Sequence, residues 1–132
     1  MATSTDLRPN IFPALRYSEG NAAIEWFKAM GFDELMVVRG PGGRIVHAEM
    51  KLGAGVVHVG EKGVAEGHEE VDAAGFGVAV YVEDVDAHYE RAKSAGAEIA
   101  EPPYDTDYGA RMYSVRDPEG NLWTFGNYRP ET

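Results

Sequence analysis

The apolar positions of residues 11–60 change their period along the chain, and the changes predict a strand, a helix and three more strands. Residues 11–17 alternate in the manner of a strand. From Ala22 the pattern becomes helical, and Gly31 should end the helix. An apolar stripe at i, i+3, i+4 and i+7 should lie on a sheet; it consists of Ala23, Trp26, Phe27 and Met30. Three strands are expected next, at Phe32–Arg39, Ile45–Leu52 and Val56–Gly60.

The same succession returns in the second half of the chain. Asp84 is a favourable N-cap for a helix over Val85–Ala95, and Gly96 should end it. The strands around this helix are expected at Phe76–Glu83, from Glu98 up to Pro102–Pro103, at Ala110–Val115 and from Leu122 to Phe125. Residues 104–109 read as a loop.

These patterns predict an α+β fold of two βαβββ modules. We expect a single domain over residues 10–132, with module one at 10–61, a polar linker at 62–75 and module two at 76–128. Residues 1–9 should form a flexible leader. Two such modules can form a curved, open, barrel-like mixed sheet with the helices outside, and small molecules commonly bind in hollows between modules.

Charge and composition argue against several kinds of binding partner and cellular location. The net charge of −10 repels nucleic acid and anionic lipid, so we expect neither nucleic acid nor membrane as a partner. No stretch approaches the ~18 apolar residues of a membrane span. The chain has no cysteine, which excludes disulfides and thiolate metal ligands, and residues 1–9 lack the apolar run of a signal peptide. A cytoplasmic location is the expectation from these observations.

The hairpin at residues 45–60 carries the richest group of polar side chains. A two-residue turn at Gly53-Ala54 sets its register, and the resulting apolar pairs share one face: Leu52 with Gly55, Met50 with Val57, and Ala48 with Val59. His47, Glu49 and His58 then lie on the other face, with Glu49 directly across from His58.

Three interpretations of this group remain open. Glu49 and His58 can be a structural cross-strand pair. They can instead line a cavity, where they recognise a ligand or transfer a proton. Together with His47 they can also form a metal site of two histidines and one carboxylate.

Aromatic residues form a second group, because several of them could stack on a planar ligand. The candidates are Phe12, Tyr81, Tyr104, Tyr108, Tyr113 and Trp123. By strand parity, Trp123 and Phe125 should face the helix layer and belong to the core.

Three segments carry a family resemblance: residues 20–32 and 81–97 with their helices, and Asp117–Phe125 with its Asp-Pro-Glu-Gly-Asn turn. Together they resemble the vicinal oxygen chelate superfamily, most closely its short glyoxalase and bleomycin-resistance group. The resemblance covers about residues 11–128. It implies the two-module fold and, for the metal-independent branch, sequestration of a bulky ligand by a homodimer.

The resemblance also implies four inward-facing strand positions that bind metal in the enzymes of the superfamily. They fall here at Phe12, His58, Val78 and Thr124, and only His58 offers a strong metal ligand. Because a catalytic metal needs about three protein ligands, we expect no metal and no cofactor. The expected function is metal-independent binding of a small molecule by Phe12, His47, Glu49, His58, Val78, Tyr113 and Thr124.

Two alternatives stay open. One is a lyase, isomerase or dioxygenase that uses His58 and Glu49 with a divalent metal. The other is a subunit-interaction or regulatory module that binds no ligand.

Overall fold

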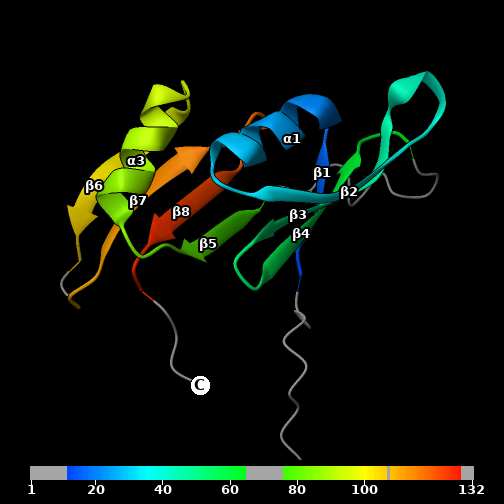
Figure 1. Ribbon diagram of the computed structural model, residues 1–132. Coiled ribbons are helices and arrows are strands. Elements are labelled where there is room, and N and C mark those ends of the chain that lie inside the picture. Colours follow the sequence, from blue (N-terminus) through cyan, green and yellow to red (C-terminus); the bar gives the residue numbers. More distant parts are fainter. Residues whose placement is uncertain (1–11, 65–75, 107, 129–132) are drawn as a thin grey trace, which may run out of the picture. The chain divides into compact units, whose positions relative to one another are not determined.

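The computed structural model describes residues 12–64, 76–106 and 108–128. The chain divides into two compact units, unit 1 at residues 1–73 and unit 2 at residues 74–132. Each unit has the element order βαβββ, as Figure 1 shows. The predicted leader at residues 1–9 and most of the predicted linker lie outside the described residues.

The sheet of unit 1 has the strand order β1-β4-β3-β2. β1 runs parallel to β4, and the other neighbours are antiparallel. The elements are β1 (Ala14–Tyr17), α1 (Gly20–Ala29), β2 (Asp33–Arg39), β3 (Ile45–Leu52) and β4 (Gly55–Glu61), with a short 3₁₀ turn at Pro41–Gly43.

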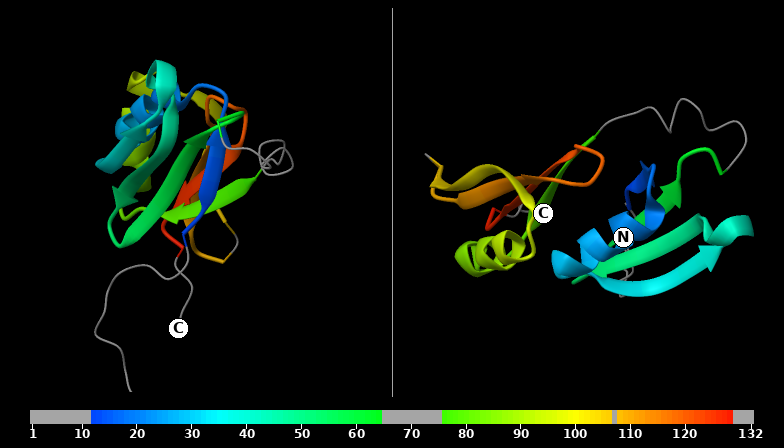
Figure 2. Two further views of the ribbon diagram at one scale, coloured as in Figure 1. Left: turned by 90° about the vertical axis from the view of Figure 1, so that its right-hand side faces the viewer. Right: turned by 90° about the horizontal axis from the view of Figure 1, so that it is seen from above.

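Unit 2 repeats this topology with the strand order β5-β8-β7-β6. Its elements are β5 (Gly77–Tyr81), α3 (Val85–Ser94), β6 (Glu98–Asp105), β7 (Arg111–Arg116) and β8 (Leu122–Gly126). The predicted α+β class and the two βαβββ modules are confirmed. Each helix lies on one face of its own curved sheet, which Figure 2 shows from two sides. We call the opposite face of each sheet its helix-free face.

The core of each unit lies between the helix and the sheet. In unit 1, Phe27 of α1 is fully buried and makes edge-on contacts with Tyr17 and Phe32. Ile24 is also buried, although it lies outside the predicted stripe. In unit 2, Trp123 and Phe125 of β8 are fully buried, which confirms their predicted place in the core. Each such side chain contributes about 1.5–3 kcal/mol by its burial.

The two helices begin in different ways. Asp84 caps α3 as predicted, because its carboxylate accepts a hydrogen bond of 3.0 Å from the Ala87 amide. At α1 the buried carboxylate of Glu61, from β4, accepts a hydrogen bond of 3.0 Å from the Gly20 amide. Glu61 also pairs with Arg44. Burial alone raises the pKa of Glu61, but the hydrogen bonds from Arg44 and Gly20 lower it overall.

The turn at Asp117–Asn121 is held by one buried carboxylate. Asp117 accepts hydrogen bonds from the amides of Glu119 and Asn121, at 3.0 and 2.9 Å. It also accepts one of 3.0 Å from the indole of Trp123. Asp117 thus connects the turn with the core of unit 2, and Gly120 supplies the positive φ of 85° that the turn requires.

Several strand boundaries differ from the predictions by one to three residues, among them those of β6 and β1. β6 continues through Pro102 and Pro103 to Asp105, so the expected loop starts later. β6 is an edge strand with two register shifts, where missing amide donors are tolerated. β1 begins only at Ala14.

Candidate functional site

The β3–β4 hairpin has the predicted register. Glu49 pairs with His58, and the three predicted apolar pairs are present. Ala48 and Met50 are fully buried on the helix side. His47 and Glu49 alternate with them, so their side chains lie on the helix-free face of the unit 1 sheet.

Three side chains that carry imidazole or carboxylate groups converge on this face. His47 Nε2 lies 2.9 Å from Glu49 Oε2, and His58 Nε2 lies 3.8 Å from the same oxygen. The two imidazole rings meet edge-on, with 4.6 Å between their centroids. One ligand atom from each residue lies within 4.8 Å of the other two. The side chains of His47, Glu49 and His58 are 35%, 28% and 28% exposed, so the group can be reached from solvent.

Apolar side chains border this polar group. Phe12 stacks on His58, with 4.6 Å between the ring centroids and 29° between the planes. Met36 and Val38 on β2 lie across from Glu49 and His47. These three apolar side chains are all more than 40% exposed. A carboxylate and two imidazoles with such a border can bind an organic ligand, exchange a proton or coordinate a metal ion.

The helix-free face of unit 2 has a different chemistry. Here Thr124 Oγ1 lies 3.0 Å from Ser114 Oγ, on the neighbouring strand. A pocket of about 210 Å³ opens over these strands, and it is lined by Ala79, Val80, Tyr81, Met112, Thr124, Gly126 and Tyr128. Among the described residues, this lining has hydroxyl groups but no charged side chain.

The register of unit 2 corrects one predicted site residue. Thr124 pairs with Ala79, whereas Val78 pairs with the core residue Trp123. Paired residues share a face of a sheet, so Val78 belongs to the helix side and Ala79 takes its place beside Thr124. Prediction from sequence placed β5 one residue out of register. Ala79, like Val78, cannot bind a metal.

Tyr113 also lies away from the helix-free face. It pairs with Phe125, is fully buried on the helix side and stacks on Phe125. Its hydroxyl lies 2.5 Å from His88 Nδ1 of α3, and burial raises the pKa of Tyr113. His88 stacks on Phe125 as well, with 4.3 Å between ring centroids. Tyr113 is therefore a core residue of unit 2, and the prediction that it binds ligand is wrong.

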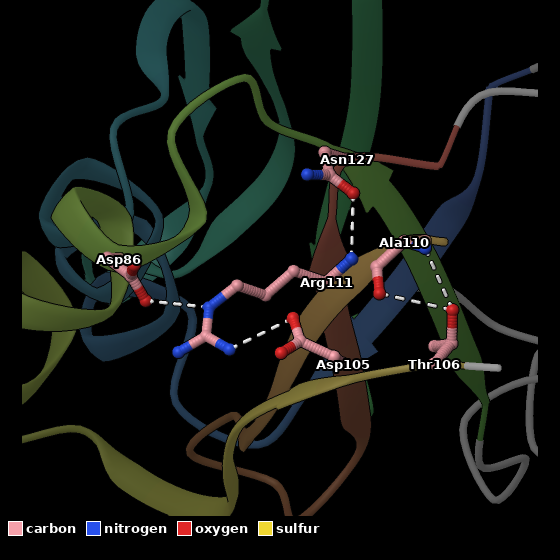
Figure 3. A network of polar contacts seen from close by, with 6 residues as sticks. All are labelled: Asp86, Asp105, Thr106, Ala110, Arg111 and Asn127. Carbon is pink, nitrogen blue, oxygen red and sulfur yellow. Dashed lines mark hydrogen bonds and ion pairs between the residues drawn. The ribbon is translucent and has the colours of Figure 1, made fainter. Parts of the chain in front are cut away.

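Arg111 lies in a hollow beside the N-terminus of α3, but its charge is matched there. Its guanidinium binds Asp86 at 3.0 Å and Asp105 at 3.1 Å, as Figure 3 shows. Hydrogen bonds to Asp86 and then Asp105 raise the pKa of Arg111. Glu83 and Asp84 also line the hollow. Its acidic lining makes it a poor site for anions.

The sequence matches one protein family over most of its length. Residues 12–125 match the family model of the Glyoxalase/Bleomycin resistance protein/Dioxygenase superfamily. The chain belongs to this superfamily. By the family's own description, its members include enzymes as well as resistance proteins, so membership alone does not decide the activity.

Three solved structures and one curated protein illustrate the similarity. TioX from Micromonospora sp. ML1, whose crystal structure is known, is 34% identical to this chain in sequence. The two structures have a TM-score of 0.77, and the match covers 92% of this chain and 99% of TioX. Lactoylglutathione lyase from Agrobacterium tumefaciens is 19% identical, with a TM-score of 0.66 over 89% and 93%. A bleomycin-binding protein complexed with bleomycin is 17% identical, with a TM-score of 0.66 over 92% and 99%. The similarity to the last two structures, at these low identities, shows a common fold and nothing about function.

The curated protein Rv0887c of Mycobacterium tuberculosis (strain ATCC 25618 / H37Rv) is 28% identical over 128 residues. These residues span 92% of this chain and 75% of that protein.

Within the described residues, no helix is long and apolar enough to cross a membrane.

Proposed function

We propose that this protein binds a planar organic molecule, neutral or cationic, on the helix-free face of unit 2, and that the four strand positions used by the enzymes of the superfamily do not together hold a metal ion. One observation carries the proposal. The helix-free face of unit 2 holds a pocket of about 210 Å³ whose lining includes two half-exposed tyrosines, Tyr81 and Tyr128.

A solvated sheet face is normally polar, so exposed aromatic side chains around a pocket need a reason. Tyrosine rings stack on planar ligands and contribute about 0.5–1.5 kcal/mol beyond their buried area. Thr124 and Ser114 add hydroxyl groups that can orient a bound polar group. The net charge of −10 favours a cationic or neutral ligand over an anion.

The four strand positions support binding without a metal there. By the resemblance and the register of β5, three of them hold Phe12, Ala79 and Thr124, and His58 is the one strong ligand that remains. One imidazole does not hold a metal ion that needs about three protein ligands.

The comparisons are compatible with this function, since a protein of the same fold is complexed with bleomycin. We further propose that the protein acts as a homodimer in the cytoplasm and that sequestration of its ligand confers resistance to an antibiotic. The absence of cysteine fits a reducing compartment. Analytical ultracentrifugation tests the dimer, and growth of an expressing strain on the bound compound tests resistance.

A ligand screen tests the binding. Planar compounds in neutral, cationic and anionic forms are titrated into the full chain, with binding followed by calorimetry in the presence of EDTA. We expect the cationic or neutral form to bind and Tyr81→Ala to weaken binding about tenfold, since base or ring stacking contributes about 1–3 kcal/mol. Tyr89→Ala is the control, because Tyr89 lies on α3, on the helix side of the unit 2 sheet, and is not part of the pocket lining.

Two results would contradict the proposal. One is that no planar compound binds. The other is that bound compounds are unaffected by both Tyr81→Ala and Thr124→Leu, which fills the pocket. Loss of binding on addition of EDTA would exclude the metal-independent mode.

A further inference from the structure

The group on the β3–β4 hairpin has a feature that organic-ligand binding leaves unexplained. Two imidazole nitrogens, His47 Nε2 and His58 Nε2, approach one carboxylate oxygen, Glu49 Oε2. We propose that His47, Glu49 and His58 bind one divalent late transition-metal ion, of the Zn²⁺, Co²⁺ and Ni²⁺ class, within unit 1.

The distances fit such an ion. Nitrogen and oxygen ligands lie about 2.0–2.2 Å from a divalent zinc ion, so neighbouring ligand atoms are about 2.9–3.6 Å apart. The separations from Glu49 Oε2 are 2.9 Å to His47 and 3.8 Å to His58. All three ligand atoms lie within 4.8 Å of one another. The separation to His58 is slightly beyond this range, so metal binding would draw His58 Nε2 closer to Glu49 Oε2.

The strands hold these residues in a fixed arrangement. β3 and β4 are the two inner strands of the unit 1 sheet, each paired on both edges. Glu49 is paired with His58 across the ladder, and His47 is two residues from Glu49 on the same face. Ligands on paired inner strands are placed more exactly than ligands on loops.

The donor set selects the class of metal. Two imidazoles and one carboxylate suit zinc, cobalt and nickel, whereas magnesium and calcium prefer oxygen ligands alone. Three protein ligands leave at least one coordination position free. The side chains are 28–35% exposed, so that position is open to solvent. Phe12, stacked on His58, covers one side of that imidazole and supports its orientation.

A structural ion pair explains the arrangement less well. Glu49 needs one histidine for a cross-strand pair, and His58, its direct partner in the register, would provide it. In the structure the shorter contact is to His47, and His58 is directed at the same oxygen. Two imidazole nitrogens around one carboxylate oxygen are what a shared cation requires.

This proposal replaces, for unit 1, the expectation from sequence that no metal binds. Two of its ligands, His47 and Glu49 of β3, are not among the four strand positions considered above, whereas the third, His58 of β4, is one of them. It does not rest on the proposed binding of an organic molecule, and either can fail alone.

The experiment uses the full chain without a tag, stripped with EDTA and then dialysed free of it. Zn²⁺, Co²⁺, Ni²⁺ and Mg²⁺ are titrated separately, with calorimetry for affinity and the visible spectrum of Co²⁺ for coordination. We expect one Zn²⁺, Co²⁺ or Ni²⁺ per chain and no binding of Mg²⁺. His47→Gln, Glu49→Gln and His58→Gln should each weaken binding about 100-fold or more, because even outer partners of a metal site change affinity by about 10–100-fold.

Two variants serve as matched controls. Lys51→Ala changes the next residue on the same face of β3, and Glu34→Gln removes a carboxylate from β2. Both should bind the metal ions like the wild type. Far-ultraviolet circular dichroism verifies that each variant is folded.

Histidine ¹⁵N spectra of the wild-type chain provide a measurement that needs no variant. On addition of Zn²⁺, the imidazole signals of two of the four histidines should shift at one equivalent. Affinities that the three glutamine variants leave unchanged would overturn the proposal. So would imidazole signals of His47 and His58 that do not move. Because no organic compound is present, neither result bears on the ligand pocket of unit 2.

Discussion

The two helix-free faces differ far more than the two helix-covered faces. Both sheets have the same strand order, and both bury aromatic side chains against their helices. On the helix-free side, unit 1 presents the group of His47, Glu49 and His58, whereas unit 2 presents a hydroxyl pair and an apolar pocket. The helix-covered faces preserve the fold, so the helix-free faces are free to acquire different chemistry.

The largest expected effect concerns the helix-covered faces, which are alike in the two units. Phe27→Ala in unit 1 and Phe125→Ala in unit 2 should each lower the free energy of unfolding by about 3–5 kcal/mol, because both side chains are fully buried. Urea unfolding measures the change. Tyr104→Ala, at an exposed position, should change it by less than about 0.5 kcal/mol. A loss below about 1 kcal/mol at either phenylalanine would contradict the placement of that core.

The second prediction concerns the start of α1. Glu61→Ala leaves the Gly20 amide without its carboxylate, and we expect a loss of about 1–3 kcal/mol. The pKa of Glu61 is lowered in the folded state. Its contribution is therefore present above the ordinary glutamate pKa of 4.5, and is lost as the pH falls through the lowered value.

Urea unfolding of the wild type and of Glu61→Gln at several pH values checks this. The difference in stability between the two should shrink on acidification. A difference that stays constant from neutral pH down to the acid limit would rule out ionised Glu61 as its source.

The residue that binds an amide at the start of the unit 2 helix should contribute less to stability than Glu61 does. Asp84 caps α3 through the Ala87 amide at an exposed position. Asp84→Ala should cost about 1 kcal/mol, and Asp84→Asn, which keeps the acceptor, much less. Thermal unfolding compares the two variants. Equal losses would show that the charge of Asp84, rather than its hydrogen bond, supports the helix.

Local patterns predicted most of the fold. The turn Gly53-Ala54 and the apolar alternation around it specify the β3–β4 register, because a shift by one residue would expose Met50 and Ala48. Asp84 and Gly96 likewise mark the ends of α3 by local backbone chemistry.

The remaining features depend on contacts between distant residues. Glu61 ends the predicted module one, and its local sequence gives no sign that it accepts a hydrogen bond from the amide of Gly20, 41 residues away. β5 has apolar or small residues at every position, so parity could not decide whether Val78 or Ala79 faces Thr124. The sequence placed His47, Glu49 and His58 on one face, but only side-chain directions show that both imidazoles approach one oxygen.

The smallest expected effect on stability belongs to a variant that tests directly whether the two helix-free faces bind different ligands. Thr124→Val removes the hydroxyl that bonds Ser114 in unit 2, and should cost about 0.5 kcal/mol because the pair is partly exposed. It should change the affinity for a planar ligand and leave the Zn²⁺ titration of unit 1 unchanged. His58→Gln should have the reverse pattern. If Thr124→Val instead weakened Zn²⁺ binding, Thr124 would belong to the metal site, and the assignment of different chemistry to the two faces would be wrong.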